Sequence, residues 1–557
     1  GPAAQAYLAY LAERRAELLQ RAEERLGRRL EVRYVYDVIL NGFSVELTPS
    51  EAALLATLPR VIRVEPREMR QLLTDRGPQW IGAAAAWGAA PDCAGGNCGE
   101  GIVVGIVDTG INMDHPSFAD IGGDGYNHTN PRGQFYGWCN PSHAKYDPAL
   151  VCNDKLIGVY SYPNSGDDPE DAEGHGSHTA STAAGNRLNN IVLDAPTVDL
   201  TFNISGVAPH ANIIAYDACD LDGCPTDDLI AALQQAATDQ VDALNYSISG
   251  SGQSPWVASD ELAFLDLRLA GAFVSASAGN SGPGASTVAH GSPWVTTTAA
   301  STHDRALVNA VINLTTDQGT QLADIYGRSV TSALPLASIV YAGDYGNALC
   351  EPSIWGGSVF AGQIVVCDRG VNARVDKAVN VQAAGGGGMI LVNAASNGDE
   401  EIGDAYVIPG VHITYNEGVT LKAWLNNGDT NHRGVIQGTV QDIEANNGDI
   451  MAAFSSRGPN NQVPDLIKPD MTAPGVDILA AVASLGQTAP EIEFYSGTSM
   501  SSPHMTGAGA LMMQAKSPAW TVAEIQSALM TTAVYDNTVR KEDGIRPTDP
   551  FDRGAGR

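Results

Sequence analysis

Residues 102–110 read IVVGIVDTG, an apolar, β-branched run that ends in Asp108-Thr109-Gly110. An uninterrupted apolar run of this length, bounded by turn residues, is typical of a strand buried on both faces. Similar short runs recur at 213–215, 243–248 and 272–276, and a helical pattern covers residues 226–239. Strands that alternate with helices predict a doubly wound α/β domain with a mostly parallel sheet.

The carboxylate of Asp108 comes directly after the first of these strands. Binding and catalytic sites of open α/β sheets lie at the carboxyl ends of their strands. An Asp-x-Gly motif also commonly caps a turn, so Asp108 alone carries little weight.

A histidine motif follows at residues 174–181, GHGSHTAS, where glycines flank His175 and a run of small residues continues as a helix. A neutral imidazole suits general-base catalysis near pH 7. A hydrogen-bonded structural histidine at a helix start is the simpler alternative. Zinc binding by His175 and His178 is a second alternative, but the pair does not form a His-Glu-x-x-His motif.

Two further motifs carry polar side chains. Asn280, in GNSG at residues 279–282, follows the strand at 272–276, although Asn-Ser-Gly also forms ordinary turns. Ser499, in SGTSMSSPHM at residues 496–505, precedes a helical run that reaches Met513. Free N–H groups at a helix start can stabilise an oxyanion beside a nucleophile, whereas a plain N-cap serine is the alternative.

The combination is far more specific than any single motif, because Asp, His and Ser occur in that order, each in a glycine-containing segment. Four segments closely resemble motifs of subtilisin-like serine proteases: VDTGI (107–111), GHGSHTAST (174–182), SAGNSGPG (277–284) and GTSMSSPHMTG (497–507).

This resemblance implies roles for individual residues. Ser499 would be the nucleophile, His175 the general base and then acid, and Asp108 the group that orients His175. The side chain of Asn280 and the backbone N–H of Ser499 would form the oxyanion hole. Ser177 stands where many relatives carry threonine, and no catalytic position is lost.

The resemblance also implies the substrate-binding residues. The segment Ser247, Ile248, Ser249 and Gly250 would be an edge strand that pairs with an extended substrate backbone. The segment from Ser275 and Ala276 to Gly279 would form a wall of the primary specificity pocket.

The first 73 residues predict a separate α+β domain. An amphipathic helix at 6–27 precedes strand-like runs at 30–40 and 43–47, divided by Asn41-Gly42. A capping box at Thr48-Pro49-Ser50-Glu51 then starts a helix to about residue 58, and a strand follows at 61–64.

This segment, with LNGFSVELT at 40–48, resembles the inhibitory prodomain of the same family, with a ferredoxin-like fold whose first strand is missing. Relatives are cut shortly before a motif like TDRGPQWIG at 74–82, so we expect maturation at Leu73/Thr74. Leu72 and Leu73 would then indicate an apolar primary pocket.

Residues 331–430 differ in pattern, with strands at 362–367 and 388–392 around a glycine-rich turn. They resemble a β-rich protease-associated domain inserted in the catalytic domain, as in plant-type subtilases. The catalytic domain would comprise residues 74–330 and 431–557.

The net charge of −31 would repel phosphate backbones and anionic lipid, so we expect neither nucleic-acid nor membrane partners. The first 73 residues hold 11 arginines and 10 acidic residues, which places the acidity in the rest of the chain. No uninterrupted apolar run of about 18 residues occurs.

The eight cysteines form four local couples, at 93/98, 139/152, 219/224 and 350/367. Disulfides in an oxidising, extracellular compartment are the favoured interpretation, with zinc as the rival at 93/98 and 219/224. We expect no cofactor, and calcium stays open because no EF-hand-type loop occurs.

The sequence therefore predicts a secreted serine endopeptidase, made as a zymogen with a self-cleaved prodomain that acts as its intramolecular inhibitor. Its substrates would be proteins or peptides. Two alternatives remain: a non-catalytic binding protein with the same fold, and an esterase or peptide ligase that uses the same acyl-enzyme.

Overall fold

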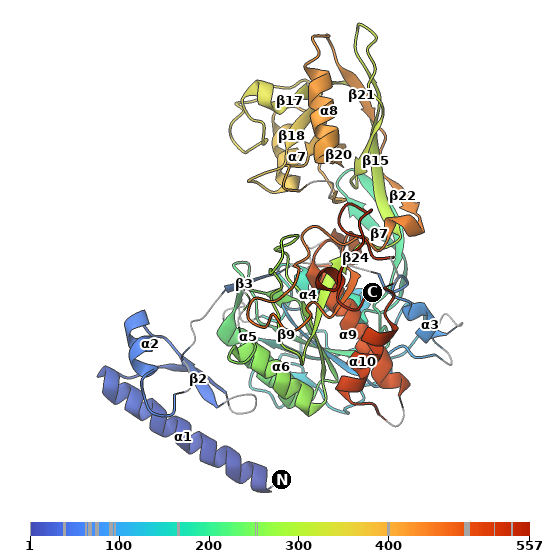
Figure 1. Cartoon of the computed structure of the whole chain (residues 1–557). Helices are drawn as coiled ribbons and strands as arrows, with labels where there is room; N and C mark the ends of the chain where they lie inside the picture. The colour runs from blue at the N-terminus through green and yellow to red at the C-terminus, as the bar shows by residue number, and fades with distance from the viewer. Residues whose placement is uncertain are drawn as a thin grey trace.

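The computed structural model covers the 557-residue chain and describes all of it except residues 1, 37–40, 62–63, 65–68, 73–76, 89–92, 94–95, 164–167, 251, 253, 398–400, 484–490, 517–518 and 536–537. Figure 1 shows an N-terminal unit, a central α/β body and a second unit rich in strands.

The central body is built on an eight-stranded sheet in the order β23-β14-β13-β11-β4-β9-β6-β5, and every pairing in it is parallel. Its strands are β4 (Val103–Asp108), β5 (Tyr136–Gly137), β6 (Leu156–Ser161), β9 (Asn212–Asp217), β11 (Ala243–Tyr246), β13 (Phe273–Ser277), β14 (Thr296–Ser301) and β23 (Met471–Pro474). The predicted parallel α/β sheet is confirmed.

Helices cover both faces of this sheet, because side chains of β4 alternate between two apolar cores. Val104 and Ile106 pack in a cluster with residues of α4 (His175–Ala184) and α9 (Thr498–Ala515). Val103 and Val107 pack in the opposite cluster with α5 (Thr226–Asp239) and α6 (Ser259–Ala270). The body also contains α3 (Ala83–Trp87), α10 (Val522–Thr532), α11 (Pro550–Arg553) and the 3-10 turn η1 (Pro116–Phe118).

Two antiparallel hairpins that the sequence did not predict extend from the body. One pairs β7 (Leu188–Ala195) with β8 (Val198–Ile204), and the other pairs β24 (Ile478–Ala481) with β25 (Ile492–Tyr495). Both contribute to one apolar cluster that also contains Leu307 and Val330.

The N-terminal unit contains α1 (Pro2–Leu26), β1 (Val32–Tyr36), β2 (Gly42–Val45) and α2 (Pro49–Leu55). Strands β1 and β2 form the predicted antiparallel hairpin, and the predicted capping box of Thr48 and Glu51 starts α2. A small core of Ala22, Leu30 and Leu55 joins the elements. Half of the strand predicted at 61–64, residues 62–63, lies outside the described residues.

The second unit is a mixed eight-stranded sheet, ordered β16-β20-β19-β18-β17-β21-β15-β22. Its strands are β15 (Arg305–Thr315), β16 (Ile325–Arg328), β17 (Leu334–Tyr341), β18 (Ile364–Asp368), β19 (Gly388–Val392), β20 (Gly410–Ile413), β21 (Arg433–Ile436) and β22 (Val440–Ile443). It also includes α7 (Arg374–Ala383), α8 (Tyr415–Leu425), η2 (Ala342–Tyr345) and η3 (Ala445–Asn447).

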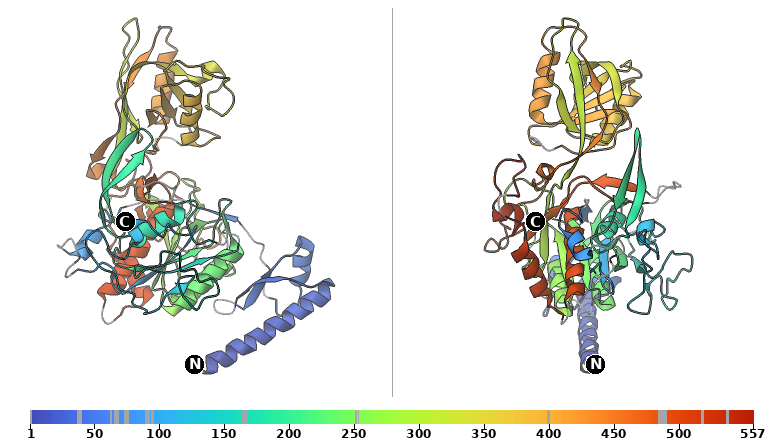
Figure 2. Two further views of the ribbon diagram at one scale, coloured as in Figure 1. Left: turned by 180° about the vertical axis from the view of Figure 1, so that it is seen from behind. Right: turned by 90° about the vertical axis from the view of Figure 1, so that its right-hand side faces the viewer.

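This sheet runs from Arg305 to Ile443 and so extends beyond the predicted insert of 331–430 on both sides. The long strand β15 extends away from the central body, as both views of Figure 2 show. Alternate residues of β18 pack on opposite faces, Ile364 and Val366 with α8, and Val365 and Cys367 with α7.

A short three-stranded sheet joins the N-terminal segment to the body. Strand β3 (Met69–Leu72) lies between β10 (Cys224–Pro225) and β12 (Ile248–Ser249) and is antiparallel to both.

All eight cysteines form disulfides, as the sequence favoured, and the structure supplies the connectivity that the sequence left open: Cys93–Cys98, Cys139–Cys152, Cys219–Cys224 and Cys350–Cys367. Within the described part of the chain, no helix combines the length and apolar character needed to cross a membrane.

Candidate active site

Three elements of the central body bring the predicted catalytic residues to one edge of the sheet. Asp108 is the last residue of β4, His175 the first residue of α4, and Ser499 the second residue of α9. Helices α4 and α9 pack against each other and against β4. The relative exposure of the three residues is only 1–2%.

Asp108 and His175 contact each other directly. The distance between Oδ1 of Asp108 and Nδ1 of His175 is 2.5 Å. A carboxylate oxygen accepts from the ring N–H at Nδ1, which leaves Nε2 as the ring nitrogen that can take up a proton. Asp108 is itself held by the backbone N–H of Thr109 at 2.9 Å and by the hydroxyl of Thr179 at 3.0 Å.

Ser499 lies in the first turn of α9, where free backbone N–H groups concentrate positive potential. Its hydroxyl donates to the carbonyl oxygen of Ser247 at 2.8 Å, and the Ser247 hydroxyl donates to the Ser499 carbonyl at 2.5 Å. Ser247, the first residue of the predicted substrate-binding segment, is therefore hydrogen-bonded to the predicted nucleophile, Ser499.

Asn280 is oriented by the residue that precedes Ser499. Its Oδ1 accepts from the backbone N–H of Thr498 at 2.9 Å and from the Thr498 hydroxyl at 3.1 Å. With the carbonyl end of the amide engaged, Nδ2 remains as a hydrogen-bond donor. The preceding residue, Gly279, has a φ of 97°, a backbone conformation that residues other than glycine rarely adopt. This turn directs Asn280 towards Thr498.

The predicted substrate-binding segment pairs with the chain's own N-terminal segment. Ile248 and Ser249 form β12 and are in register with Leu72 and Gln71 of β3. Gly250 follows β12 and is partly exposed. An extended backbone thus already pairs with this strand, directly before the predicted junction at Leu73/Thr74, which itself lies outside the described residues.

Ser275 and Ala276 lie inside β13 and are fully buried. The hydroxyl of Ser275 is 3.2 Å from the hydroxyls of Thr298 and Ser502, in the sheet interior. Their place in a pocket wall stays a prediction.

Asp171 is a buried residue that the sequence reasoning missed. Its Oδ2 accepts from the N–H and hydroxyl of Ser177 at 2.8 and 2.6 Å. Its Oδ1 accepts from the Gly174 N–H at 2.7 Å and from the Thr109 hydroxyl at 3.0 Å. Asp171 therefore joins the loop after Asp108 to the start of the His175 helix. The signal in the sequence was an aspartate placed three residues before a glycine that starts a helix.

Two glutamates lie in the segment that precedes α4. Oε2 of Glu173 accepts from the backbone N–H of His175 at 2.9 Å. Burial raises the pKa of Glu170 to about 7, and the nearby carboxylates of Asp114, Asp168 and Asp171 act in the same direction.

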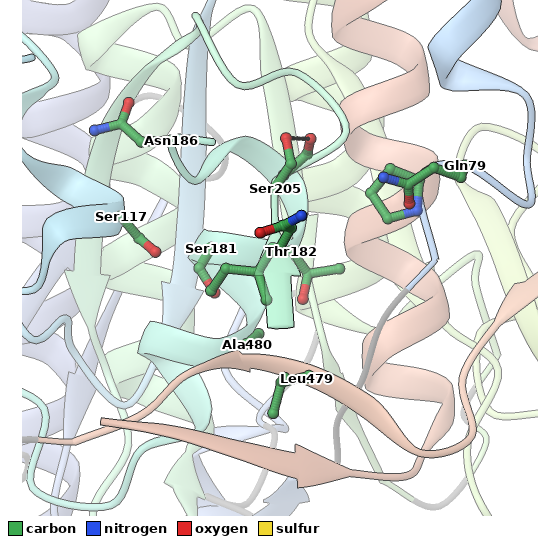
Figure 3. A pocket seen from close by; sticks show the side chains of 12 residues that line it. Gln79, Ser117, Ser181, Thr182, Asn186, Ser205, Leu479 and Ala480 are labelled. Carbon is green, nitrogen blue, oxygen red and sulfur yellow. Dashed lines mark hydrogen bonds between the residues drawn. The ribbon is translucent and has the colours of Figure 1, made fainter. Parts of the chain in front are cut away.

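A small polar cavity lies apart from these residues, between α4, the end of β8 and β24 (Figure 3). Its space of about 20 Å³ is that of a single water molecule. The buried hydroxyls of Ser117 and Thr182 line it and have no hydrogen-bond partner among the described residues. It offers hydroxyl and amide groups and no carboxylate.

Cys93 and Cys98 form a disulfide, the interpretation that the sequence favoured over zinc, although His210 lies beside them. The disulfide removes the thiolates that zinc would bind, and the His210 ring nitrogens contact Glu100 and Asp124 at 2.7 and 3.0 Å.

A parallel α/β sheet with Asp, His and Ser at one edge, in that chain order, is the arrangement of subtilisin-like serine proteases. Residues 99–549 match the sequence model of the subtilase family, and residues 4–73 match that of peptidase inhibitor I9. The chain belongs to the subtilase family of serine proteases, and it carries an inhibitor I9 prodomain.

Similar curated proteins come from Arabidopsis thaliana. Subtilisin-like protease SBT1.4 is 36% identical over 90% of this chain and 66% of its own length. SBT1.6 is 36% identical over 94% of this chain and 70% of its length, and SBT1.7 is 35% identical over 94% and 71%. The chain therefore spans about two thirds of the length of these relatives.

A solved structure of the psychrophilic subtilisin-like protease Apa1 from Pseudoalteromonas sp. AS-11 covers 87% of this chain and 95% of its own, at 16% identity. Its TM-score with this chain is 0.41.

Proposed function

We propose that this chain is a secreted serine endopeptidase, made as a zymogen, that cleaves protein or peptide substrates through an acyl-enzyme on Ser499. The observation that carries the proposal is the hydrogen bond between Asp108 and His175. It forms at the edge of the sheet where Ser499 also lies.

In the proposed reaction, the Ser499 hydroxyl turns from the Ser247 carbonyl towards Nε2 of His175 and attacks the substrate carbonyl as His175 takes its proton. Asp108 stabilises the imidazolium that forms. Nδ2 of Asn280 and the Ser499 N–H stabilise the oxyanion. His175 then protonates the leaving amine, and water releases the acyl group by the reverse sequence.

The pairing of β3 supports the zymogen part of the proposal. Residues 69–72 lie between β10 and β12 as an added strand, which is how an extended substrate would bind. Cleavage at Leu73/Thr74 would leave them as a bound product that blocks the site. Leu72 and Leu73 favour an apolar primary pocket.

Four disulfides support a secreted enzyme, since such bonds persist in oxidising compartments. We assign the second sheet to a protease-associated insert because of the sequence resemblance of residues 331–430. Calcium is not required by any step of this proposal.

Intact-mass analysis of the purified chain and of Ser499→Ala, together with casein hydrolysis, tests the proposal. We expect only the unchanged chain to split near residue 73 and to digest casein. If neither chain splits, and casein survives even after the N-terminal segment is removed, the non-catalytic binding protein becomes the better interpretation. Faster turnover of esters or transfer to added amines, with casein intact, would favour the esterase or ligase.

A further inference from the structure

Strand β3 lies between β10 and β12, which we call the two walls of a substrate channel. A disulfide-closed loop forms the β10 wall. The loop runs from Cys219 to Cys224, between β9 and α5, and its end is strand β10. Cys224 is in register with Arg70, and Pro225 with Met69. One partner of the disulfide is therefore itself a strand residue that pairs with the bound segment.

The same disulfide connects this wall to the catalytic sheet. Cys219 comes two residues after Asp217, the last residue of β9, which is in register with Asp108 of β4. Between them, the backbone N–H of Ala218 donates to the Asp108 carbonyl at 2.8 Å. Both cysteines are buried, with 2% and 0% exposure. The bond thus ties β10 to the strand beside the one that presents Asp108.

The two walls contact different parts of the bound segment. Strand β12 pairs with residues 71 and 72, nearest to the predicted junction, and the preceding residue, Ser247, is bonded to Ser499. Strand β10 pairs with residues 69 and 70, further from the junction. A short substrate would reach β12 alone, whereas a longer one would also pair with β10.

We propose that the Cys219–Cys224 disulfide is a positioning element for extended substrates: it holds β10 where a substrate backbone can pair with it four or more residues before the cleaved bond. This inference rests on the proposed endopeptidase function. A disulfide that closes so short a loop constrains the unfolded chain less than a long-range one would, and in the folded chain it acts on this loop. Two hydrogen bonds between Asp220 and Gly223 shape the rest of the loop, at 2.9 and 3.0 Å.

The test compares two peptide amides that share the residues next to the cleaved bond, one with two and one with five residues before it. The variant Cys219→Ser with Cys224→Ser should lose about tenfold in kcat/KM on the longer peptide, mainly through KM, as expected for the loss of one or two ordered backbone hydrogen bonds. Its kcat/KM on the shorter peptide should stay within about twofold of the parent.

The matched control is Cys93→Ser with Cys98→Ser, since that disulfide spans the same sequence separation of 5 and lies outside the channel. This control should change kcat/KM by the same factor on both peptides. The inference would be overturned, and the protease function left intact, if the ratio of kcat/KM on the longer peptide to kcat/KM on the shorter one were the same in the Cys219 and Cys224 variant as in the parent. A parent chain inactive on both peptides would overturn the proposed function, and this inference with it.

A second variant covers the case in which the double cysteine variant does not fold. Oδ1 of Asp220 accepts from the N–H groups of Asp222 and Gly223 at 2.8 and 3.1 Å. Asp220→Ala keeps the disulfide but loosens the turn, so it should lose about threefold in kcat/KM on the longer peptide only. Equal losses on both peptides, or none, would contradict a positioning role for this loop.

Discussion

The carboxylate of Asp108 is almost fully buried, yet its two oxygens accept from three groups: the His175 ring, the Thr109 N–H and the Thr179 hydroxyl. This arrangement orients the His175 ring and fixes the proton on Nδ1. At the scale of single residues, the proposed chemistry depends on that choice of tautomer.

Asp108→Asn should lower kcat by about 10⁴-fold, because an amide can donate to Nδ1 and so favours the tautomer whose Nε2 cannot accept the Ser499 proton. Peptide hydrolysis under saturating substrate measures the effect. Asp239→Asn is the control, since Asp239 is a buried carboxylate bonded to Tyr160 and Tyr216 away from the site. A loss smaller than about tenfold for Asp108→Asn would contradict the assigned role.

Asn280→Ala should lower kcat by about 10²–10³-fold with little change in KM, because its amide would bind the oxyanion only as that charge develops. Steady-state kinetics separate the two constants. The exposed Asn461→Ala should be neutral. A rise in KM with kcat unchanged would instead assign Asn280 to substrate binding.

Glu170 should make stability depend on pH. Burial raises its pKa from 4.5 to about 7, so the folded chain holds this proton more tightly than the unfolded chain does. The contribution of Glu170 to the free energy of unfolding therefore falls as pH rises from about 4.5 to about 7. In a Ser499→Ala background, Glu170→Gln should raise Tm at pH 8 more than at pH 5.

The control for this effect is Glu444→Gln, which removes an exposed carboxylate elsewhere. It should shift Tm equally at both pH values. If Glu170→Gln gives the same shift at pH 5 as at pH 8, the carboxyl group is not protonated in the folded chain near neutral pH.

At the scale of elements, the sequence predicted those whose signals are local. Residues 226–239 form α5 as expected, residues 388–392 form β19, and Thr48 and Glu51 cap α2. The hairpins of β7 with β8 and β24 with β25 were missed, because their apolar residues pack against strands distant in sequence rather than in a local pattern. Asp171 left only a weak local signal, its spacing to Gly174, and its contact with the distant Thr109 forms only in the folded chain.

The contact between prodomain and catalytic domain includes an ion pair at a helix start. Arg33 of β1 lies 3.3 Å from Asp227 and 3.6 Å from Asp228, in the first turn of α5. Arg33→Glu would place like charges together there, so the cleaved prodomain should dissociate about tenfold faster than from the parent. The time course of casein hydrolysis after self-cleavage measures this release.

Arg29→Glu, an exposed change in the same domain, should leave that time course unaltered. High salt should reduce the difference between Arg33→Glu and the parent, because it screens partly exposed charges. Equal release rates for both variants at low salt would show that the ion pair does not hold the prodomain.

At the scale of the whole molecule, the chain has 63 acidic and 32 basic residues, and the first 73 residues contribute almost none of this imbalance. The negative charges of the central body and the second sheet therefore repel one another in the folded state, and unfolding relieves that repulsion by separating the charges.

Raising ionic strength from about 0.01 to about 0.5 M shortens the Debye length from about 30 Å to below 8 Å, which screens most of this repulsion. In the Ser499→Ala background, Tm should rise over this range, equally with NaCl and KCl if screening is the cause. A Tm that is constant or falls would mean that local ion pairs, such as Arg557 with Asp449, outweigh the net repulsion. A rise with only one of the two salts would instead indicate a specific ion site.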